Sequence, residues 1–350
     1  MKKTIYLSIY EKVKQKIING TYAYGTYIAS KRTMAEDYHV SLVSVEHAYD
    51  LLSEEGYIEP VERKGYMVIY REKDLFAGPV KRTAAKKSTL LENHEYIAYS
   101  TLAKTMRKVM NDHGEEIMLH KDRQGMLEFR RSIAAYLARS RNIYVSADQI
   151  LITAGAESAY SMIVEMLGRY RIYGIEKPSY EKIEQIYLSE GVHLDHLKMG
   201  AAGILTSELE RTPASVLHVT PFSSYPTGVT ADAGKRQEYI TWAKKQNAFI
   251  VEDDYASEYS PSTKTEETLF AMEPEQAVFY MNSFTKTIAP AVRISYIVLP
   301  GKLKAKLLKE VSFRDCGVSA FDQLVAAELM NNGSFEKHLN KVKRKMRKMK

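Results

Sequence analysis

The chain contains one cysteine, Cys316, and no long apolar run among its 350 residues. A single cysteine cannot form an internal disulfide, and it excludes every zinc motif that is built from several cysteines. No stretch reaches the roughly 18 to 20 apolar residues that a membrane-crossing helix needs. The N-terminal MKKTIY is followed by charged residues and not by the apolar core of a signal peptide. We therefore expect a cytoplasmic protein with neither a membrane segment nor a metal site.

Apart from its last ten residues, the chain also has no general excess of positive charge. The formal net charge is +7, but the last ten residues contain seven Lys or Arg and no acid. The preceding 340 residues therefore carry no net charge. DNA binding would have to depend on the local placement of basic residues, because overall charge does not favour it. The length is sufficient for two domains with a sizeable core.

The first 71 residues carry the pattern of a winged helix-turn-helix. Residues 7–19 have apolar side chains at every fourth position, which predicts an amphipathic helix. Ser30 and Ser41 precede two further short helical stretches and are typical N-cap residues. Two short β-prone runs then surround a tight turn at Lys64 and Gly65, which predicts a hairpin, the wing.

The rest of the chain predicts an α/β domain. Residues 72–92 are polar and basic without periodicity, so we interpret them as a linker. From residue 93 to 350, helical stretches alternate with short apolar runs, which begin at Ile150, Val216, Phe249, Val278 and Ile294. This alternation predicts a mostly parallel sheet with helices on both faces.

The most informative segment runs from Ser283 to Arg293 and contains Lys286, 31 residues after Tyr255 in the sequence EDDY. A lysine that forms a Schiff base with pyridoxal 5'-phosphate needs an acidic partner for the pyridine nitrogen. It also needs cationic or hydroxyl partners for the phosphate. Asp253, Ser283 and Arg293 are residues of these types, in one order along the chain.

Several motifs, from about residue 119 to 339, resemble the fold-type-I aminotransferase domain of MocR/GabR-type regulators. They are DRQG at 122–125, TAGAESA at 153–159, EKPSY at 176–180, TPFSSYPTG at 220–228, and the segments around Asp253 and Lys286. The resemblance implies these cofactor-binding residues: Gly155, Ala156, Glu157, Tyr180, Tyr225, Asp253, Tyr255, Ser283, Lys286 and Arg293.

The resemblance also implies a role for each part of this site. The helix N-terminus after Gly155 would bind phosphate through backbone N–H groups, because a helix N-terminus carries unpaired donors and partial positive charge. Tyr180 would stack on the cofactor ring, and Asp253 would pair with the pyridine nitrogen. Tyr255 would contact the phenolic oxygen, and Lys286 would hold the aldehyde.

The sequence departs from the family pattern at three places. Tyr225 stands where aminotransferases usually have an asparagine, which favours a regulator over an enzyme. His120 stands where a tyrosine usually reaches across a homodimer to the partner's phosphate. The chain ends at Lys350 within a predicted basic helix. We therefore expect the family's small C-terminal domain to be absent, with the arginine for an effector carboxylate beyond residue 350.

Residues 5–70 resemble the GntR-type winged helix-turn-helix, which binds double-stranded DNA. In that family the recognition helix enters the major groove and the wing contacts the minor groove or backbone. The DNA-binding residues implied are Ser30, Arg32, Ser41, Ser44, Arg63, Lys64 and Gly65. Leu42 replaces a usual arginine, and Glu46 on the recognition helix would repel phosphate unless it accepts from a cytosine amino group.

We interpret the chain as a homodimeric transcriptional regulator that senses an amino acid, an amine or pyridoxal phosphate through Lys286 and responds at a DNA operator. The main alternative is a working aminotransferase with an accessory N-terminal domain, which would convert an amino acid to a keto acid. A third hypothesis is a DNA-binding protein with a vestigial sensor, for which loss of Lys286 would change nothing. A truncated gene product is a fourth.

Overall fold

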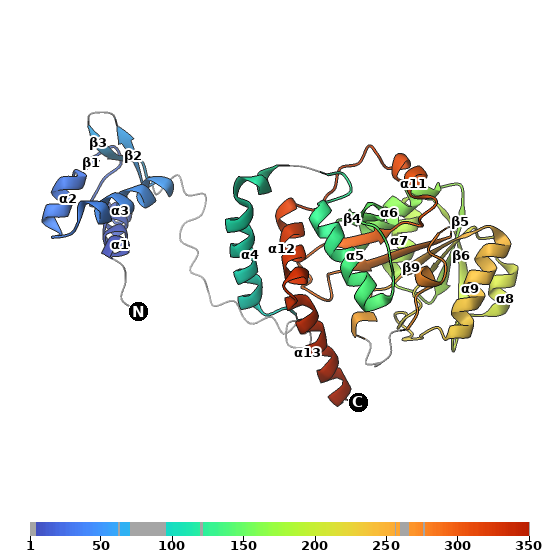
Figure 1. Ribbon diagram of the computed structural model, residues 1–350. Coiled ribbons are helices and arrows are strands. Elements are labelled where there is room, and N and C mark those ends of the chain that lie inside the picture. Colours follow the sequence, from blue (N-terminus) through green and yellow to red (C-terminus); the bar gives the residue numbers. More distant parts are fainter. Residues whose placement is uncertain are drawn as a thin grey trace. The chain divides into compact units, whose positions relative to one another are not determined.

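The computed structural model describes residues 5–61, 64–70, 96–119, 122–255, 257–259, 266–275 and 277–349. The chain separates into two compact units, residues 1–88 and 89–350, and each is described by itself (Figure 1). The predicted linker at 72–92, the wing residue Arg63 and the phosphate-side residue His120 lie outside the described residues. Within the described ranges, every helix is too short or too polar to cross a membrane.

The N-terminal unit is a three-helix, three-stranded winged helix. Its elements are α1 (Ile5–Ile18), β1 (Tyr27–Ile28), α2 (Lys31–Asp37), α3 (Leu42–Glu54), β2 (Ile58–Val61) and β3 (Gly65–Val68). The strands are antiparallel in the order β1-β3-β2. The side chains of Ser30 and Ser41 accept hydrogen bonds from the backbone N–H groups of Thr33 and Ser44. Both predicted N-caps and the predicted hairpin are therefore confirmed.

The second unit is built on an eight-stranded sheet in the order β4-β11-β10-β9-β8-β5-β6-β7. The strands are β4 (Ile150–Thr153), β5 (Ile172–Lys177), β6 (His193–Gly200), β7 (Gly203–Ile204), β8 (Val216–Val219), β9 (Phe249–Asp253), β10 (Val278–Ser283) and β11 (Ser295–Val298). Strand β11 is antiparallel to both of its neighbours, and β7 is antiparallel to β6. The pairings from β10 through β9, β8 and β5 to β6 are parallel. The predicted, mostly parallel sheet is confirmed.

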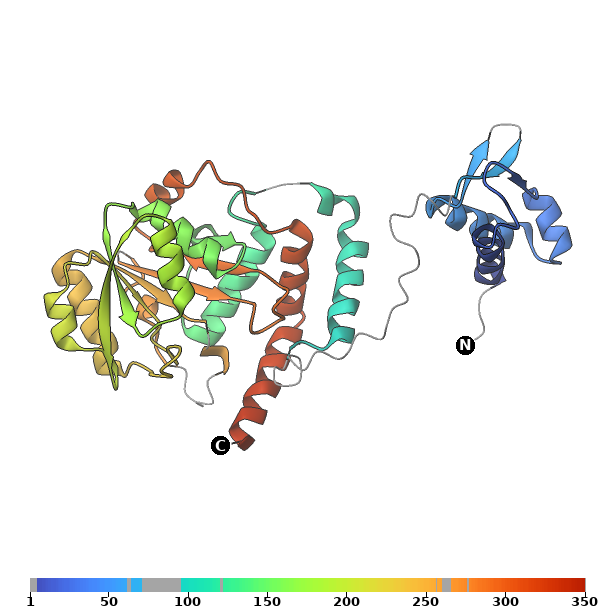
Figure 2. The same cartoon turned by 180° about the vertical axis from the view of Figure 1, so that it is seen from behind.

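Helices cover both faces of this sheet (Figures 1 and 2). They are α4 (Tyr99–His113), α5 (Leu127–Arg141), α6 (Ala156–Leu167), α7 (Glu181–Ser189), α8 (Thr206–Arg211), α9 (Ala233–Gln246), α10 (Leu269–Met272), α11 (Lys304–Glu310), α12 (Ala320–Asn331) and α13 (Ser334–Met349). Helices α6, α7 and α11 share one apolar cluster with the sheet. Helices α5, α9, α10 and α12 share the other, and α4 packs on α12. Short 3₁₀ turns lie at Gly114–Met118, Ala147–Gln149 and Ser257–Tyr259.

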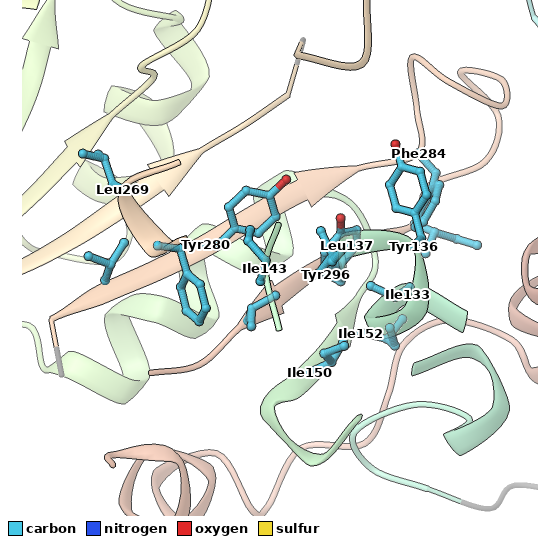
Figure 3. Packing of buried hydrophobic residues seen from close by; sticks show 14 of the residues in the cluster. Ile133, Tyr136, Leu137, Ile143, Ile150, Ile152, Leu269, Tyr280, Phe284 and Tyr296 are labelled. Carbon is cyan, nitrogen blue, oxygen red and sulfur yellow. The ribbon is translucent and has the colours of Figure 1, made fainter. Parts of the chain in front are cut away.

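The cluster on the α5 face contains a group of buried aromatic rings at the end of the sheet where β10 and β11 meet (Figure 3). The ring centroids of Phe284 and Tyr296 are 5.7 Å apart, and those of Tyr280 and Tyr296 are 6.3 Å apart. The backbone N–H of Ile97, just before α4, donates to the carbonyl oxygen of Ile288 at 3.2 Å. This bond ties the start of the described part of the second unit to the connection between β10 and β11.

Candidate functional site

A cavity of about 360 Å³ lies at the carboxyl ends of β8, β9 and β10, the place where open α/β sheets bind ligands. Thr220 follows β8, Asp253 ends β9, and Ser283 ends β10. Nine of the ten residues predicted to bind the cofactor line the cavity: Ala156, Glu157, Tyr180, Tyr225, Asp253, Tyr255, Ser283, Lys286 and Arg293. The tenth, Gly155, is the N-cap residue of α6 beside it.

One end of the cavity is formed by the N-terminus of α6 and the side chain of Arg293. Gly155 has φ +88°, and a Cβ atom there would lie 2.8 Å from the Arg293 guanidinium. Glycine is therefore required both by the backbone conformation and by the close approach of the arginine. Ser283 Oγ donates to Thr285 Oγ1 at 2.9 Å, so two hydroxyls also face this end. Cation, hydroxyls and helix N-terminus together suit an anion.

The side chain of Glu157 lies at the same end. Its carboxylate accepts a hydrogen bond from Arg293 Nη2 at 2.8 Å and another from the ammonium of Lys182 on α7. The contact with Lys182, and then the charge of Arg293, hold the pKa of Glu157 below its usual value. Glu157 is therefore ionised at neutral pH and bridges two cations.

Asp253 also lines the cavity and is 4% exposed. Tyr160 OH donates to Asp253 Oδ2 at 2.6 Å, and His218 Nε2 lies 3.7 Å from the same oxygen. The other ring nitrogen of His218 is 2.7 Å from Tyr187 OH. A buried carboxylate with these polar neighbours is a suitable partner for a protonated ring nitrogen.

Lys286 lines the same cavity, from the connection between β10 and β11. Its Nζ is 4.0 Å from the ring centroid of Tyr255, whose hydroxyl donates to the carbonyl oxygen of Ser223 at 3.1 Å. Burial lowers the pKa of Lys286, and the negative charge of Asp253 only partly opposes this. More of the amine is therefore unprotonated near neutral pH, which is the form that attacks a carbonyl carbon.

Two tyrosines stand at the mouth of the cavity. Tyr180 is 43% exposed and Tyr225 is 58% exposed. Their ring centroids are 6.1 Å apart at an interplanar angle of 83°, an edge-to-face contact. The loop that carries Tyr225 is held by Glu176 at the end of β5, which accepts from Ser224 Oγ at 2.6 Å and from the Thr220 N–H at 3.1 Å.

Sequence reasoning missed several residues of this site: Tyr160, Lys182, Ile183, Thr220 and Thr285 in the cavity wall, and His218 behind Asp253. Tyr160 could have been predicted, because it is four residues after Ala156 on α6 and residues at this spacing lie on the same face of a helix. Lys182 was not, because its place depends on how α7 packs beside α6.

The predicted DNA-contacting surface is a second candidate site, at the start of α2 and α3 and at the wing. Arg32 and Lys64 are exposed, whereas the hydroxyls of Ser41 and Ser44 bond to each other at 2.9 Å. Glu46 accepts from Lys31 Nζ at 2.8 Å, so its charge is offset within the unit. Leu42 and the adjacent Val43 are 45% and 60% exposed. The first turn of α3 therefore presents apolar side chains, which suit thymine methyl groups.

Comparison with known proteins identifies the family of each unit. Residues 5–68 match the family model for bacterial regulatory proteins of the gntR family, and residues 91–350 match aminotransferase class I and II. The chain is 27% identical to the HTH-type transcriptional regulator YdeL of Bacillus subtilis, over 98% of this chain and 77% of that protein. It is 26% identical to the probable rhizopine catabolism regulatory protein MocR of Rhizobium meliloti, over 96% of this chain and 73% of that protein.

Solved structures share the fold of the second unit. An archaeal alanine:glyoxylate aminotransferase has a TM-score of 0.64 and 22% identity, covering 69% of this chain and 62% of that one. A kynurenine aminotransferase of Pyrococcus horikoshii has a TM-score of 0.64 and 21% identity, covering 73% of this chain and 68% of that one. The chain therefore belongs to the aminotransferase class I and II family, joined at its N-terminus to a gntR-family domain, the domain composition of the MocR/GabR type.

Proposed function

We propose that this protein is a pyridoxal-phosphate-dependent transcriptional regulator that acts as a cytoplasmic homodimer. The proposal rests chiefly on one observation. A lysine with a lowered pKa, Lys286, shares one cavity with a buried carboxylate and with the N-terminus of α6 beside Arg293, in a chain that also carries a winged helix-turn-helix. The N-terminal unit would bind the operator, and the second unit would bind the cofactor and an amino acid or amine.

The residues of the cavity suit pyridoxal phosphate by their chemistry. Gly155 leaves room at the N-terminus of α6 that a Cβ atom would fill, and Arg293 lies over it. Asp253, whose Oδ2 already accepts from Tyr160, would hold a proton on a pyridine nitrogen by its negative charge. Ser283 and Thr285 add hydroxyl donors for a phosphate.

When bound, pyridoxal phosphate supplies an aldehyde that condenses with a primary amine, with loss of water. Lys286 would provide that amine, and the lowering of its pKa by burial favours the unprotonated form that condenses. Tyr255 covers the ammonium with its ring and keeps its own hydroxyl on Ser223. Tyr180, at the mouth of the cavity, would pack against the cofactor ring. An effector amine would release Lys286, and the freed ammonium would have to find other partners.

The first experiment is an absorbance titration of the purified chain with pyridoxal phosphate. We expect a band near the visible edge in the natural chain and its loss in Lys286→Ala, because the band requires the lysine amine. Lys302→Ala is a matched control, since Lys302 is an exposed lysine of the same unit and should leave the band unchanged. An identical spectrum for the natural chain and Lys286→Ala would reject the proposal.

A second experiment separates a regulator from a working aminotransferase. The natural chain with pyridoxal phosphate is mixed with candidate amino acids and 2-oxoglutarate, and keto-acid formation is measured beside the spectrum. We expect a spectral change without sustained turnover, together with changed binding to the operator. Steady transamination without any effect on DNA binding would favour the enzyme.

A further inference from the structure

The anion site at the N-terminus of α6 already contains a negative charge, the carboxylate of Glu157, at the place where a phosphate would bind. Its carboxylate contacts Arg293 at 2.8 Å and is hydrogen-bonded to Lys182. Both cations line the cavity, and both are about half exposed, at 48% and 50% of their side chains. Glu157 therefore neutralises the charges that a phosphate group needs.

The position of Glu157 makes this competition direct. It is the second residue of α6, so its carboxylate gains from the partial positive charge of the helix N-terminus, as a phosphate would. Arg293 lies close to the same helix terminus, since its guanidinium occupies the space that a Cβ atom on Gly155 would need. A phosphate that binds there must share Arg293 with Glu157 or displace the carboxylate.

We infer that Glu157 is an internal competitor of the cofactor phosphate and sets how strongly the site prefers a phosphorylated aldehyde over an unphosphorylated one. This inference rests on the proposed function. Pyridoxal and pyridoxal phosphate would condense with Lys286 in the same way, in which Nζ would add to the aldehyde carbon and water would leave. They differ at the phosphate, so removal of the Glu157 charge should affect only one of them.

The inference has a functional consequence. A cofactor whose phosphate must displace a carboxylate dissociates more readily than one held by two unpaired cations. A site weakened in this way would need a higher free concentration of the cofactor for the same occupancy. Glu157 would therefore tune the protein to report the supply of phosphorylated pyridoxal itself, besides any amine that reacts with it.

The test is a pair of titrations of the full chain, with pyridoxal phosphate and with pyridoxal, each followed by the band that depends on Lys286. In Glu157→Gln we expect the Kd for pyridoxal phosphate to fall about tenfold, as for the loss of one repulsive charge near the surface. The Kd for pyridoxal should change by less than about twofold, since the substitution keeps the shape of the side chain. The preference for the phosphorylated aldehyde should therefore rise about tenfold.

Glu181→Gln is the matched control. Glu181 is exposed at the start of α7, next to Lys182, and its substitution makes the same change in net charge outside the cavity wall. An equal gain in Glu181→Gln would show a general charge effect and overturn the inference. So would an unchanged or reduced preference in Glu157→Gln. Absence of the band from the natural chain would instead reject the proposed function, and the inference with it.

A second readout does not depend on Lys286. Inorganic phosphate should raise the thermal unfolding midpoint of Glu157→Gln at lower concentrations than it does for the natural chain, because a ligand of the folded state stabilises it by mass action. An equal response of the two proteins to phosphate would count against a shared anion site.

Discussion

Asp253 and Asp254 are neighbours at the end of β9, yet they face opposite sides of the sheet. Asp253 faces the cavity, where Tyr160 donates to it and His218 lies nearby. Asp254 faces the α5 side and is fully buried, where it is paired with Arg141 and accepts from Tyr280 OH at 2.8 Å. Side chains alternate between the faces of a strand, so adjacent identical residues enter different environments.

This comparison shows that the side chains around a buried carboxylate determine whether it stabilises the fold or can bind a ligand. Asp254 has a full positive charge beside it, so its negative charge is offset within the protein. Asp253 accepts from the neutral hydroxyl of Tyr160, has His218 3.7 Å away, and acts on the amine of Lys286 through its charge. We therefore expect Asp253 to act on groups in the cavity, whereas Asp254 stabilises the fold.

The largest effect should come from removing Asp254. In Asp254→Ala the guanidinium of Arg141 stays buried without its carboxylate, and breaking such a pair costs about 3–5 kcal/mol of unfolding free energy. Chemical denaturation of the two proteins measures this difference. A loss below about 1 kcal/mol would mean that water or another group replaces the carboxylate, and the contrast with Asp253 would fail.

Glu258, a buried neighbour of Asp254, should make the free energy of unfolding depend on pH. Burial, and then the charge of Asp254, raise the pKa of Glu258 from 4.5 to about 7. Its other charged and polar neighbours include Arg141, Asn282, Tyr136, Tyr280, Tyr296, Lys286 and Lys343. The folded state therefore binds a proton more tightly than the unfolded state. The stabilisation of the folded state that comes from the protonated Glu258 is fully present below pH 4.5 and is lost as the pH rises through about 7.

The matching variant is Glu258→Gln, which keeps an oxygen for Asn282 Nδ2. It should remove about 1–3 kcal/mol of the pH dependence of unfolding between these values. Burial also raises the pKa of Glu252 to about 8 and that of Glu176 to about 7, so part of the dependence should remain. The same slope in both proteins, from denaturation at several pH values, would contradict the assignment to Glu258.

The smallest effect on stability should come from Asp253→Asn. The amide oxygen can still accept from Tyr160, so we expect less than about 1 kcal/mol of lost unfolding free energy. Affinity for pyridoxal phosphate should fall by about 5- to 30-fold, since the negative charge opposite the pyridine nitrogen is lost. Titration and denaturation of the same preparation check both statements. A large loss of stability with unchanged cofactor affinity would reverse the roles of the two aspartates.

Local features of the fold could be predicted from the sequence. Ser30 and Ser41 cap their helices through atoms three residues away, so the sequence contains the whole interaction. Strands β5 and β6 were missed because Gly174 and the polar residues of HLDHLKMG hide the usual apolar pattern. In the structure Gly174 is closely packed, since a Cβ atom there would lie 3.0 Å from the side chain of Leu197.

The site could be predicted only in part. Asp253 and Lys286 were predicted from their sequence motifs. The alternation of side chains along β9 predicts that Asp253 and Asp254 face opposite sides of the sheet, but it does not predict which side contains the cavity. The pairing of Glu157 with Lys182 depends on the packing of α6 against α7, which no short sequence pattern contains.

The hydrogen bond from Ile97 to Ile288 reaches the connection that carries Lys286. Ile288 is two residues after Lys286, and both isoleucines are at most 7% exposed. Ile97 lies just after the segment at 71–95 that joins the two units in sequence. The backbone two residues after the amine of Lys286 is therefore hydrogen-bonded to the first residues of the second unit that the structure describes. Removal of this bond is a change close to Lys286 that leaves every side chain of the cavity wall in place.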